Sequence, residues 1–237
     1  MGFTRTSTYN SNSSSGAISS LAYNGTLTAG SLLIVWVTFG SGNGGSPPSV
    51  SGTNNGSFGS AIKSVYDSGP GQGLAIFALV NGSNTSETIN FTNTTNWMGI
   101  IIEEWIGCAS SSPADGSAGQ AQDSGSGGTN SVTSGNFSAT SGDLVLSCTV
   151  NNSSLSSLTA GSAFNSDLSI SSLWGYSGYF MITESQTLSG TTASGAFSAS
   201  SGSGEETICI CAAFKAAVGG SGANFLQQME WWGRLPC

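Results

Sequence analysis

Histidine is absent from the 237 residues of this chain, and only 7% of the residues are charged. Without histidine, the chain cannot form Ser-His-Asp or Cys-His nucleophile pairs, and most zinc sites are excluded as well. The phosphate-binding loop motif GxxxxGK followed by Ser or Thr is also missing. Soluble domains usually carry roughly 25% charged residues. The surface must therefore consist mainly of hydroxyl and amide groups.

Basic residues are scarce too: there are four, and the net charge is −8. A nucleic-acid-binding protein needs a basic stripe to replace phosphate counterions, so this class is excluded. Binding to anionic membranes is disfavoured for the same reason, and no window approaches the ~18–20 apolar residues of a membrane-spanning helix. The first residues, MGFTRTSTYN, lack the apolar segment of a secretory signal. We therefore expect a protein made in the cytoplasm, or one from which a signal has been removed.

Cysteine is infrequent and odd in number, with Cys209 and Cys211 two residues apart. Two such neighbours share one face of a strand, and bridging them would strain the backbone. We expect buried free thiols, with some disulfide as the alternative. The five cysteines are Cys108, Cys148, Cys209, Cys211 and Cys237.

Strand-length apolar runs separated by Gly, Ser and Asn clusters make up most of the chain, and helix signals are nearly absent before the last 20 residues. Some of these runs, such as LLIVWVTF, are apolar on both faces, as in a central strand. The expected strands are Leu32–Phe39, Leu74–Val80, Thr88–Thr92, Gly99–Ile106, Asp143–Val150, Tyr179–Thr183, Gly195–Ala199 and Thr207–Phe214.

The two halves of the sequence repeat the same pattern. Residues 27–37 (LTAGSLLIVWV) match 139–150 (ATSGDLVLSCTV), and residues 74–107 match 178–216. Each half alone would make a sheet with an apolar face and nothing to cover it. We therefore predict an all-β fold: one antiparallel, jelly-roll-like β-sandwich of about eight or more strands over residues 1–217, followed by a tail over 218–237.

An ordered series of short motifs runs from about Ala29 to Ala217: AGSLLIVWV, YDSG, IFALV, EEWIG, SGDLVLS, LTAGSAF and AAFKAA. With this series the chain resembles Gly/Ser/Thr-rich, jelly-roll-like β-sandwich modules of bacteriophage virion proteins and bacterial surface proteins. Each motif is a strand edge or a turn, so the resemblance concerns the fold more than the function.

The resemblance implies a non-enzymatic virion protein, made in the host cytoplasm, that decorates a capsid, forms a head fibre or belongs to a tail. Its partners would be other virion proteins and further copies of itself. The alternative is a carbohydrate-binding or adhesion module of a bacterial surface or extracellular filament protein. A third hypothesis is a hydrolase or lyase that uses Glu103.

Carboxylates and aromatic residues are the candidate site residues. Glu103 and Glu104 are adjacent on an expected strand and point to opposite faces, so we expect one inward and one outward, at a strand end. We expect no catalytic residue, cofactor or metal, with calcium as the one alternative at loop aspartates. These aspartates are Asp67, Asp115, Asp123, Asp143 and Asp167.

Six aromatic residues are candidates for stacking on a sugar. Trp36 and Trp105 lie in apolar strands, so we expect them in the core. Packing in the core or at its rim is the favoured interpretation of these aromatic residues. Small polar residues flank Trp97, Trp174 and Tyr176, which are therefore the better exposed ones and the candidate glycan-binding residues. Tyr179 completes the set.

The last residues follow a Gly/Ser link at 219–222. If Asn224–Trp232 forms a helix, its apolar side chains make a stripe that needs a partner, because so short a helix does not hold in water alone. We expect this tail to dock on another protein, with packing on its own sandwich or disorder as alternatives. The anchoring residues would be Phe225, Leu226, Met229, Trp231 and Trp232.

Overall fold

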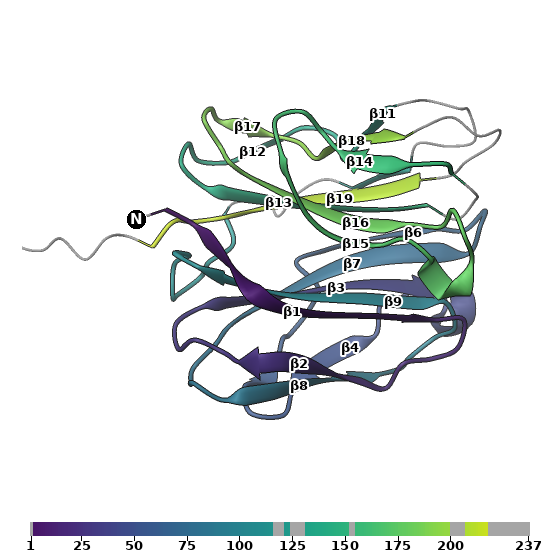
Figure 1. Cartoon of the computed structure of the whole chain (residues 1–237), viewed down its shortest axis with the longest axis horizontal. Helices are drawn as coiled ribbons and strands as arrows, with labels where there is room; N and C mark the ends of the chain where they lie inside the picture. Colours follow the sequence, from purple (N-terminus) through teal and green to yellow (C-terminus); the bar gives the residue numbers. More distant parts are fainter. Residues whose placement is uncertain (1, 116–120, 124–130, 152–154, 200–206, 218–237) are drawn as a thin grey trace, which may run out of the picture.

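Antiparallel strands make up nearly all of the regular structure (Figure 1). The computed structural model describes residues 2–115, 121–123, 131–151, 155–199 and 207–217. Two single 3-10 turns, η1 (Ser41–Asn43) and η2 (Leu173–Gly175), are the only helical elements in these residues. The predicted all-β antiparallel sandwich class is confirmed. Within the same residues, no helix is long and apolar enough to cross a bilayer.

The N-terminal half forms two sheets. The inner sheet has the order β1 (Thr4–Ser14), β9 (Met98–Ile106), β3 (Leu32–Gly40), β7 (Gln72–Val80) and β6 (Lys63–Asp67). The outer sheet has the order β2 (Ser20–Thr26), β8 (Ser86–Thr92), β4 (Ser49–Gly52) and β5 (Gly56–Ser57).

The C-terminal half repeats this arrangement. Its inner sheet has the order β10 (Ala121–Asp123), β19 (Thr207–Phe214), β13 (Leu144–Asn151), β16 (Met181–Thr187) and β15 (Asn165–Ile170). Its outer layer consists of β11 (Ser131–Thr133), β18 (Ala196–Ala199) and β14 (Leu158–Ala160), with the pair β12 (Phe137–Ser138) and β17 (Thr192–Ala193) beside them. The order of the inner strands matches that of the first half one for one, so the internal repeat seen in the sequence is a structural repeat.

The chain has four layers of strands, twice the number of a simple sandwich. In Figure 1 the two inner sheets face each other in the middle, and each outer sheet covers its own half. The physical reason is that β3, β13 and β19 are buried along their whole length and on both faces. Such strands need cover on each side, which a two-layer sandwich does not give.

The eight strands expected from apolar runs all exist, but several polar strands were not expected. The clearest is β1, TRTSTYNSNSS, which pairs with β9 at the edge of the inner sheet. It carries hydroxyl and amide side chains, so no apolar pattern marks it. Its hydrogen bonds to β9 place it there, and its polar side chains suit an edge strand.

The four described cysteines are buried free thiols, as predicted, and Cys237 lies outside the described residues. Burial raises the pKa of each of them, that of Cys108 to about 12. Because the thiolate is the reactive form, these cysteines serve as small apolar residues of the core.

Candidate functional site

Glu103 and Glu104 are both buried in the middle of the fold, each 1% exposed. They point to opposite faces, as expected, but neither points outward or lies in solvent, so that prediction was wrong. Glu104 faces the outer sheet of its half, where it accepts hydrogen bonds from the Tyr23 hydroxyl (3.0 Å) and the Thr28 backbone N–H (2.5 Å). Glu103 faces the other half of the molecule. Each strand face here is a packing interface, so both carboxyls are enclosed.

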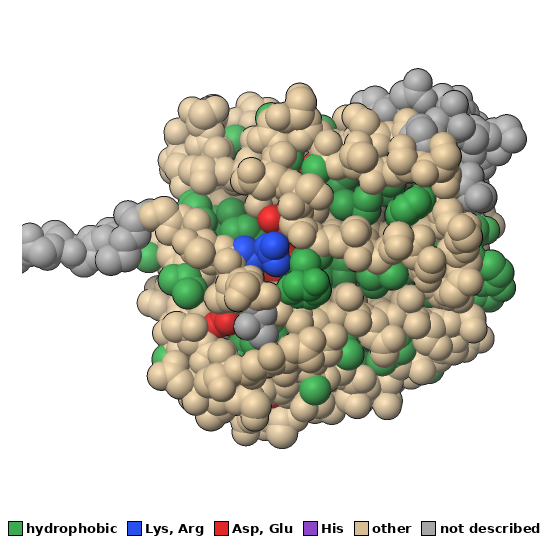
Figure 2. Space-filling view, viewed as in Figure 1, with side chains coloured by type: hydrophobic (Ala, Val, Ile, Leu, Met, Phe, Trp, Pro, Cys, Tyr) green, Lys and Arg blue, Asp and Glu red, His purple; other side chains and the backbone are tan. Residues whose placement is uncertain are grey.

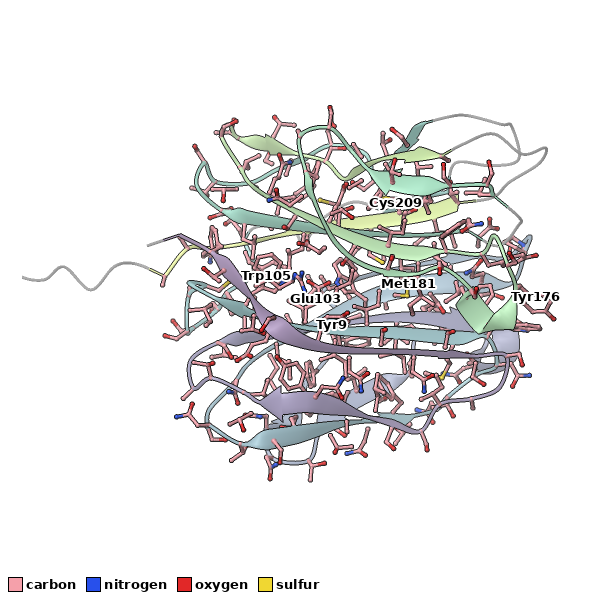
Figure 3. The ribbon with its side chains drawn as sticks, in the orientation of Figure 1. Tyr9, Glu103, Trp105, Tyr176, Met181 and Cys209 are labelled. Atoms are coloured by element: carbon pink, nitrogen blue, oxygen red, sulfur yellow. The ribbon has the colours of Figure 1, made fainter. Side chains whose placement is uncertain are left out.

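Glu103 lies in the central layer with few partners (Figure 3). One carboxyl oxygen accepts a hydrogen bond from the Trp105 indole N–H at 3.0 Å, and the other has no partner. Burial, and then the charge of Asp167, raise the pKa of Glu103 from 4.5 to about 7, although the Thr183 side chain, Trp105 and Arg5 oppose this rise. Asp167 itself pairs with Arg5 at 3.5 Å. A substrate has no path to so enclosed a carboxyl.

Three of the aspartates proposed as calcium ligands were wrongly expected in loops, because Asp67, Asp123 and Asp167 belong to strands β6, β10 and β15. Two of the proposed ligands are held in local contacts. Asp67 accepts the Gly69 N–H at 2.8 Å, and Asp115 accepts both the N–H and the hydroxyl of Thr140 at 2.8 and 2.9 Å. Within the described part of the chain, no three His, Cys, Asp or Glu side chains are grouped closely enough to hold a metal ion. The side chain of Asp123 lies outside the described residues.

The aromatic candidates behave differently, because four of them come together at one end of the interface between the halves. Trp97 precedes β9 in the N-terminal half, whereas Trp174 and Tyr176 lie at η2 in the C-terminal half. A pocket of about 310 Å³ opens among them, at the lower end of the roughly 300–1,000 Å³ of ligand sites. Figure 3 shows Tyr176 at the edge of the molecule, at the far end from Trp105. The lining residues are Pro70, Gly71, Gln72, Trp97, Trp174, Tyr176 and Tyr179.

The rings of the pocket form a cup and not a flat strip. Trp97 and Trp174 have centroids 5.8 Å apart and planes at 73°, and Trp97 and Tyr176 lie 5.9 Å apart at 39°. Tyr179 contacts both Tyr176 (5.4 Å, 40°) and Trp174 (6.0 Å, 65°). Such offset and edge-on contacts stabilise the cluster. The cup therefore presents ring faces in several directions to a ligand.

Exposure differs among the candidates. Trp97 is 39% and Tyr176 49% exposed, as expected from their polar neighbours. Trp174, also named as one of the better exposed candidates, is only 8% exposed, which agrees with the favoured packing interpretation: its ring is the floor on which Trp97 and Tyr179 pack. Trp36 and Trp105 are core residues, as predicted, at 0% and 4%.

Both tryptophans of the pocket have left-handed backbone conformations. The φ angle is +61° at Trp97 and +58° at Trp174. Bulky residues rarely adopt this region, and such residues concentrate at functional sites, where the surrounding structure holds them in place. Only two other non-glycine residues in the described ranges share this feature, Asn93 and Ser112. The strain thus falls on the two tryptophans that pack against each other in the pocket wall.

Hydrogen bonds from the sheets hold the two tryptophan loops in place. The Trp97 carbonyl accepts from the Thr38 hydroxyl at 3.1 Å, and the same hydroxyl accepts the Gly99 N–H at 2.7 Å. On the other side, the backbone N–H of Trp174 donates to the hydroxyl oxygen of Ser13 in β1, at 3.2 Å. The pocket is therefore built before any ligand arrives, which lowers the entropic cost of binding.

Gly99 allows the two halves to approach closely beneath the pocket. A Cβ at this position would lie 2.6 Å from the Leu173 side chain, which is fully buried and directly precedes Trp174. We expect Gly99→Ala to destabilise the protein by about 1–3 kcal/mol through overpacking, which lowers Tm by roughly 2–10 °C for a chain of this size.

The matched control is Gly190→Ala, because no atom lies within 4 Å of a Cβ at Gly190. Calorimetry should find the Tm of this control within about 2 °C of wild type. An unchanged Tm for Gly99→Ala would show that Leu173 moves aside freely and that the contact does not fix the pocket.

Sequence reasoning missed Gln72 as a pocket residue. This side chain is 4% exposed, and its Nε2 has no hydrogen-bond partner. Gln72 is the first residue of β7, and its side chain lies on the same face of the sheet as the core residues Leu74 and Ile76. A polar residue just before a buried strand was the available signal, but it is common at strand ends and marks no site by itself.

The proposed anchoring residues of the tail, Phe225, Leu226, Met229, Trp231 and Trp232, lie outside the described residues. Comparisons with protein-family models, curated proteins and solved structures gave no match to this chain. The pocket is thus the feature on which a functional conclusion rests.

Proposed function

We propose that this chain is a non-enzymatic carbohydrate-binding module and that the aromatic pocket is its glycan site. The observation that carries the proposal is the assembly of Trp97, Trp174 and Tyr176 into one preformed cup across the interface between the halves. The C–H face of a sugar ring packs well on an aromatic face, while hydroxyl groups at the rim remain available for hydrogen bonds.

Two further observations support a binding role over catalysis. The two most suitable carboxyls, Glu103 and Glu104, are each enclosed by strands and 1% exposed. The lining contains no His, Asp, Glu or Lys, the side chains that most often transfer protons in hydrolysis, and its hydroxyl-bearing side chains are Tyr176 and Tyr179.

The surface suits a module displayed in many copies. Figure 2 shows a face that is mostly uncharged, with its few basic and acidic atoms gathered near the middle. We propose, following the resemblance to phage decoration and fibre modules, that the protein is a virion component and that the pocket contacts host-surface glycans. Bacterial surface display is the alternative setting. Partner binding through the tail and assembly with further copies are parts of the same proposal.

A glycan microarray tests the glycan-binding proposal. The fluorescently labelled full-length chain is applied to neutral, amino and acidic glycans at several protein concentrations. The proposal requires saturable binding to at least one class of glycan. If no glycan binds at protein concentrations up to the millimolar range, the pocket is not a carbohydrate site.

A further inference from the structure

We propose that the pocket binds the free, non-reducing end of an uncharged glycan chain and not a segment within the chain. This inference rests on the proposed carbohydrate function and names the part of the glycan that enters the pocket. Four features carry it: the arrangement of the four rings, the floor beneath them, the surface around the entrance, and the uncharged lining.

The four aromatic rings of the pocket contact one another in a closed circuit. Trp97 contacts Trp174 and Tyr176, and Tyr179 contacts the same two rings, with centroids between 5.4 and 6.0 Å apart. The planes of neighbouring rings are inclined at 39° to 73°. A chain that binds along its length needs nearly coplanar rings in a row, so that successive sugars each find a face. Inclined rings in a circuit surround one sugar instead.

The pocket has a closed floor. Trp174 lines the pocket but is only 8% exposed, and Leu173, directly before it, is fully buried. Leu173 packs so closely on Gly99 that a Cβ there would lie 2.6 Å from its side chain. This packing leaves no channel beneath the floor, so a glycan enters from the side of the exposed rings and does not pass through.

The surface around the entrance offers no continuation of the pocket. Trp97 and Tyr176 are the exposed rings there, at 39% and 49%. Among the described residues, Tyr9 is the one other aromatic side chain with a similar exposure, and Figure 3 places it well away from Tyr176. The volume of about 310 Å³ is at the lower end of ligand sites. The pocket therefore suits a ligand of one or two sugar rings.

The chemistry of surface glycans and of the lining decides which chain end binds. Glycans on a cell surface are attached through their reducing end, so the end that is free to enter a pocket is the non-reducing one. None of the seven lining residues is charged. A carboxylate or ammonium group on the terminal sugar would lose hydration here without gaining an ionic partner. The terminal sugar is therefore an uncharged one.

An array of matched glycans tests the inference with the full-length wild-type chain. One set keeps the internal segment and varies the terminal sugar among glucose, galactose, mannose and N-acetylglucosamine, and the other set keeps the terminal sugar and varies the segment. We expect affinities to differ at least about tenfold among terminal sugars and less than about threefold among segments. Capping a bound glycan with sialic acid should weaken binding at least about tenfold, because it covers the end and adds a charge.

Calorimetric titrations with linear oligosaccharides of two to six residues, all with the preferred terminal sugar, give a second readout. We expect one protein per chain at every length and affinities within about threefold of each other, because one end of each chain enters the pocket. Recognition within the chain would instead raise the number of bound proteins, or the affinity, as the chain lengthens.

The variant Tyr176→Ala opens one side of the circuit. We expect its affinity for the disaccharide to fall about tenfold, since the terminal sugar loses one of the ring faces around it. Tyr9→Ala is the matched control and should bind within about twofold of wild type. If Tyr176→Ala also binds like wild type, the circuit does not enclose the sugar and the inference is wrong.

The outcomes separate this inference from the glycan proposal. If affinity follows the internal segment, or if more proteins bind as the chain lengthens, the carbohydrate function stands and the chain-end inference is wrong. Equal binding of sialylated and uncapped glycans would overturn the uncharged free end. If no glycan on the array binds, the carbohydrate function fails and this inference fails with it. The array and the length series use wild-type protein, so they decide even if the variant folds poorly.

Discussion

Replacing Trp97 by alanine is expected to weaken glycan binding by at least about 30-fold, which corresponds to the ~2 kcal/mol of a hot-spot residue. Trp97 supplies the exposed wall of the cup and contacts both Trp174 and Tyr176. Its removal leaves a sugar ring with no face to pack on from the N-terminal half. Isothermal titration calorimetry with the best neutral glycan from the array measures the loss.

The matched control for this substitution is Tyr9→Ala. Tyr9 is 42% exposed, close to the 39% of Trp97, and Figure 3 places it well away from Tyr176. The control should bind within about twofold of wild type. Equal binding by Trp97→Ala and wild type would show that the cup is a packing cluster and that the glycan, if one binds, binds elsewhere.

Folding stability is expected to fall as the pH rises from about 4.5 to about 7. The pKa of Glu103 rises to about 7 and so does that of Glu184, chiefly through burial, and that of Asp143 rises to about 6 for the same reason. In this window the unfolded carboxyls have released protons that the folded ones still hold. The unfolded state then binds fewer protons, so the free energy of unfolding decreases with pH by linkage.

The variant Glu103→Gln isolates one of the two largest parts of this effect. Below about pH 4.5 the carboxyl is protonated in both states, so the variant and wild type should have similar stabilities. At pH 8 the variant should be more stable by up to about 3 kcal/mol, because glutamine stays neutral where the glutamate must ionise without a full set of donors. Urea unfolding at a series of pH values measures the difference.

Glu184→Gln is the contrasting variant. Glu184 accepts the Gly161 N–H at 3.0 Å through one oxygen and the Ala196 N–H at 2.9 Å through the other. A glutamine amide there turns an NH₂ group toward a backbone donor, so we expect about 1–3 kcal/mol of destabilisation even at low pH. If Glu103→Gln changes stability equally at pH 5 and pH 8, Glu103 is ionised throughout, and our account of the central layer is wrong.

The sequence predicted the strands that are apolar and the repeat that relates the halves. β3 stands out because LLIVWVTF is apolar on both faces, and β13 because LVLSCTV has one fully apolar face, although the structure buries both faces of β13. The burial of both faces of these strands required four layers. The covering strands were hard to recognise, because segments such as β2 and β14 are short and show no regular apolar alternation. Their position depends on pairing with partners far away in sequence, which local pattern does not carry.

The candidate site was predicted in part. Trp97 and Tyr176 were chosen for small polar neighbours, and these neighbours do leave both side chains exposed. Trp174 has similar neighbours but is buried, because η2 folds it inward beneath Trp97. Trp97 and Trp174 are 77 residues apart along the chain. The three aromatic residues meet because one half of the molecule packs on the other. No feature of either loop encodes that contact.

The most direct test of the central claim is an NMR titration of the ¹⁵N-labelled chain with the neutral glycan that the array selects. Indole N–H signals are assigned by single substitutions. Our account predicts that the Trp97 and Trp174 signals shift on saturation, because both rings line the pocket, while those of the core residues Trp36 and Trp105 stay in place. A bound glycan that leaves Trp97 and Trp174 unmoved, or that moves only other tryptophans, would contradict it.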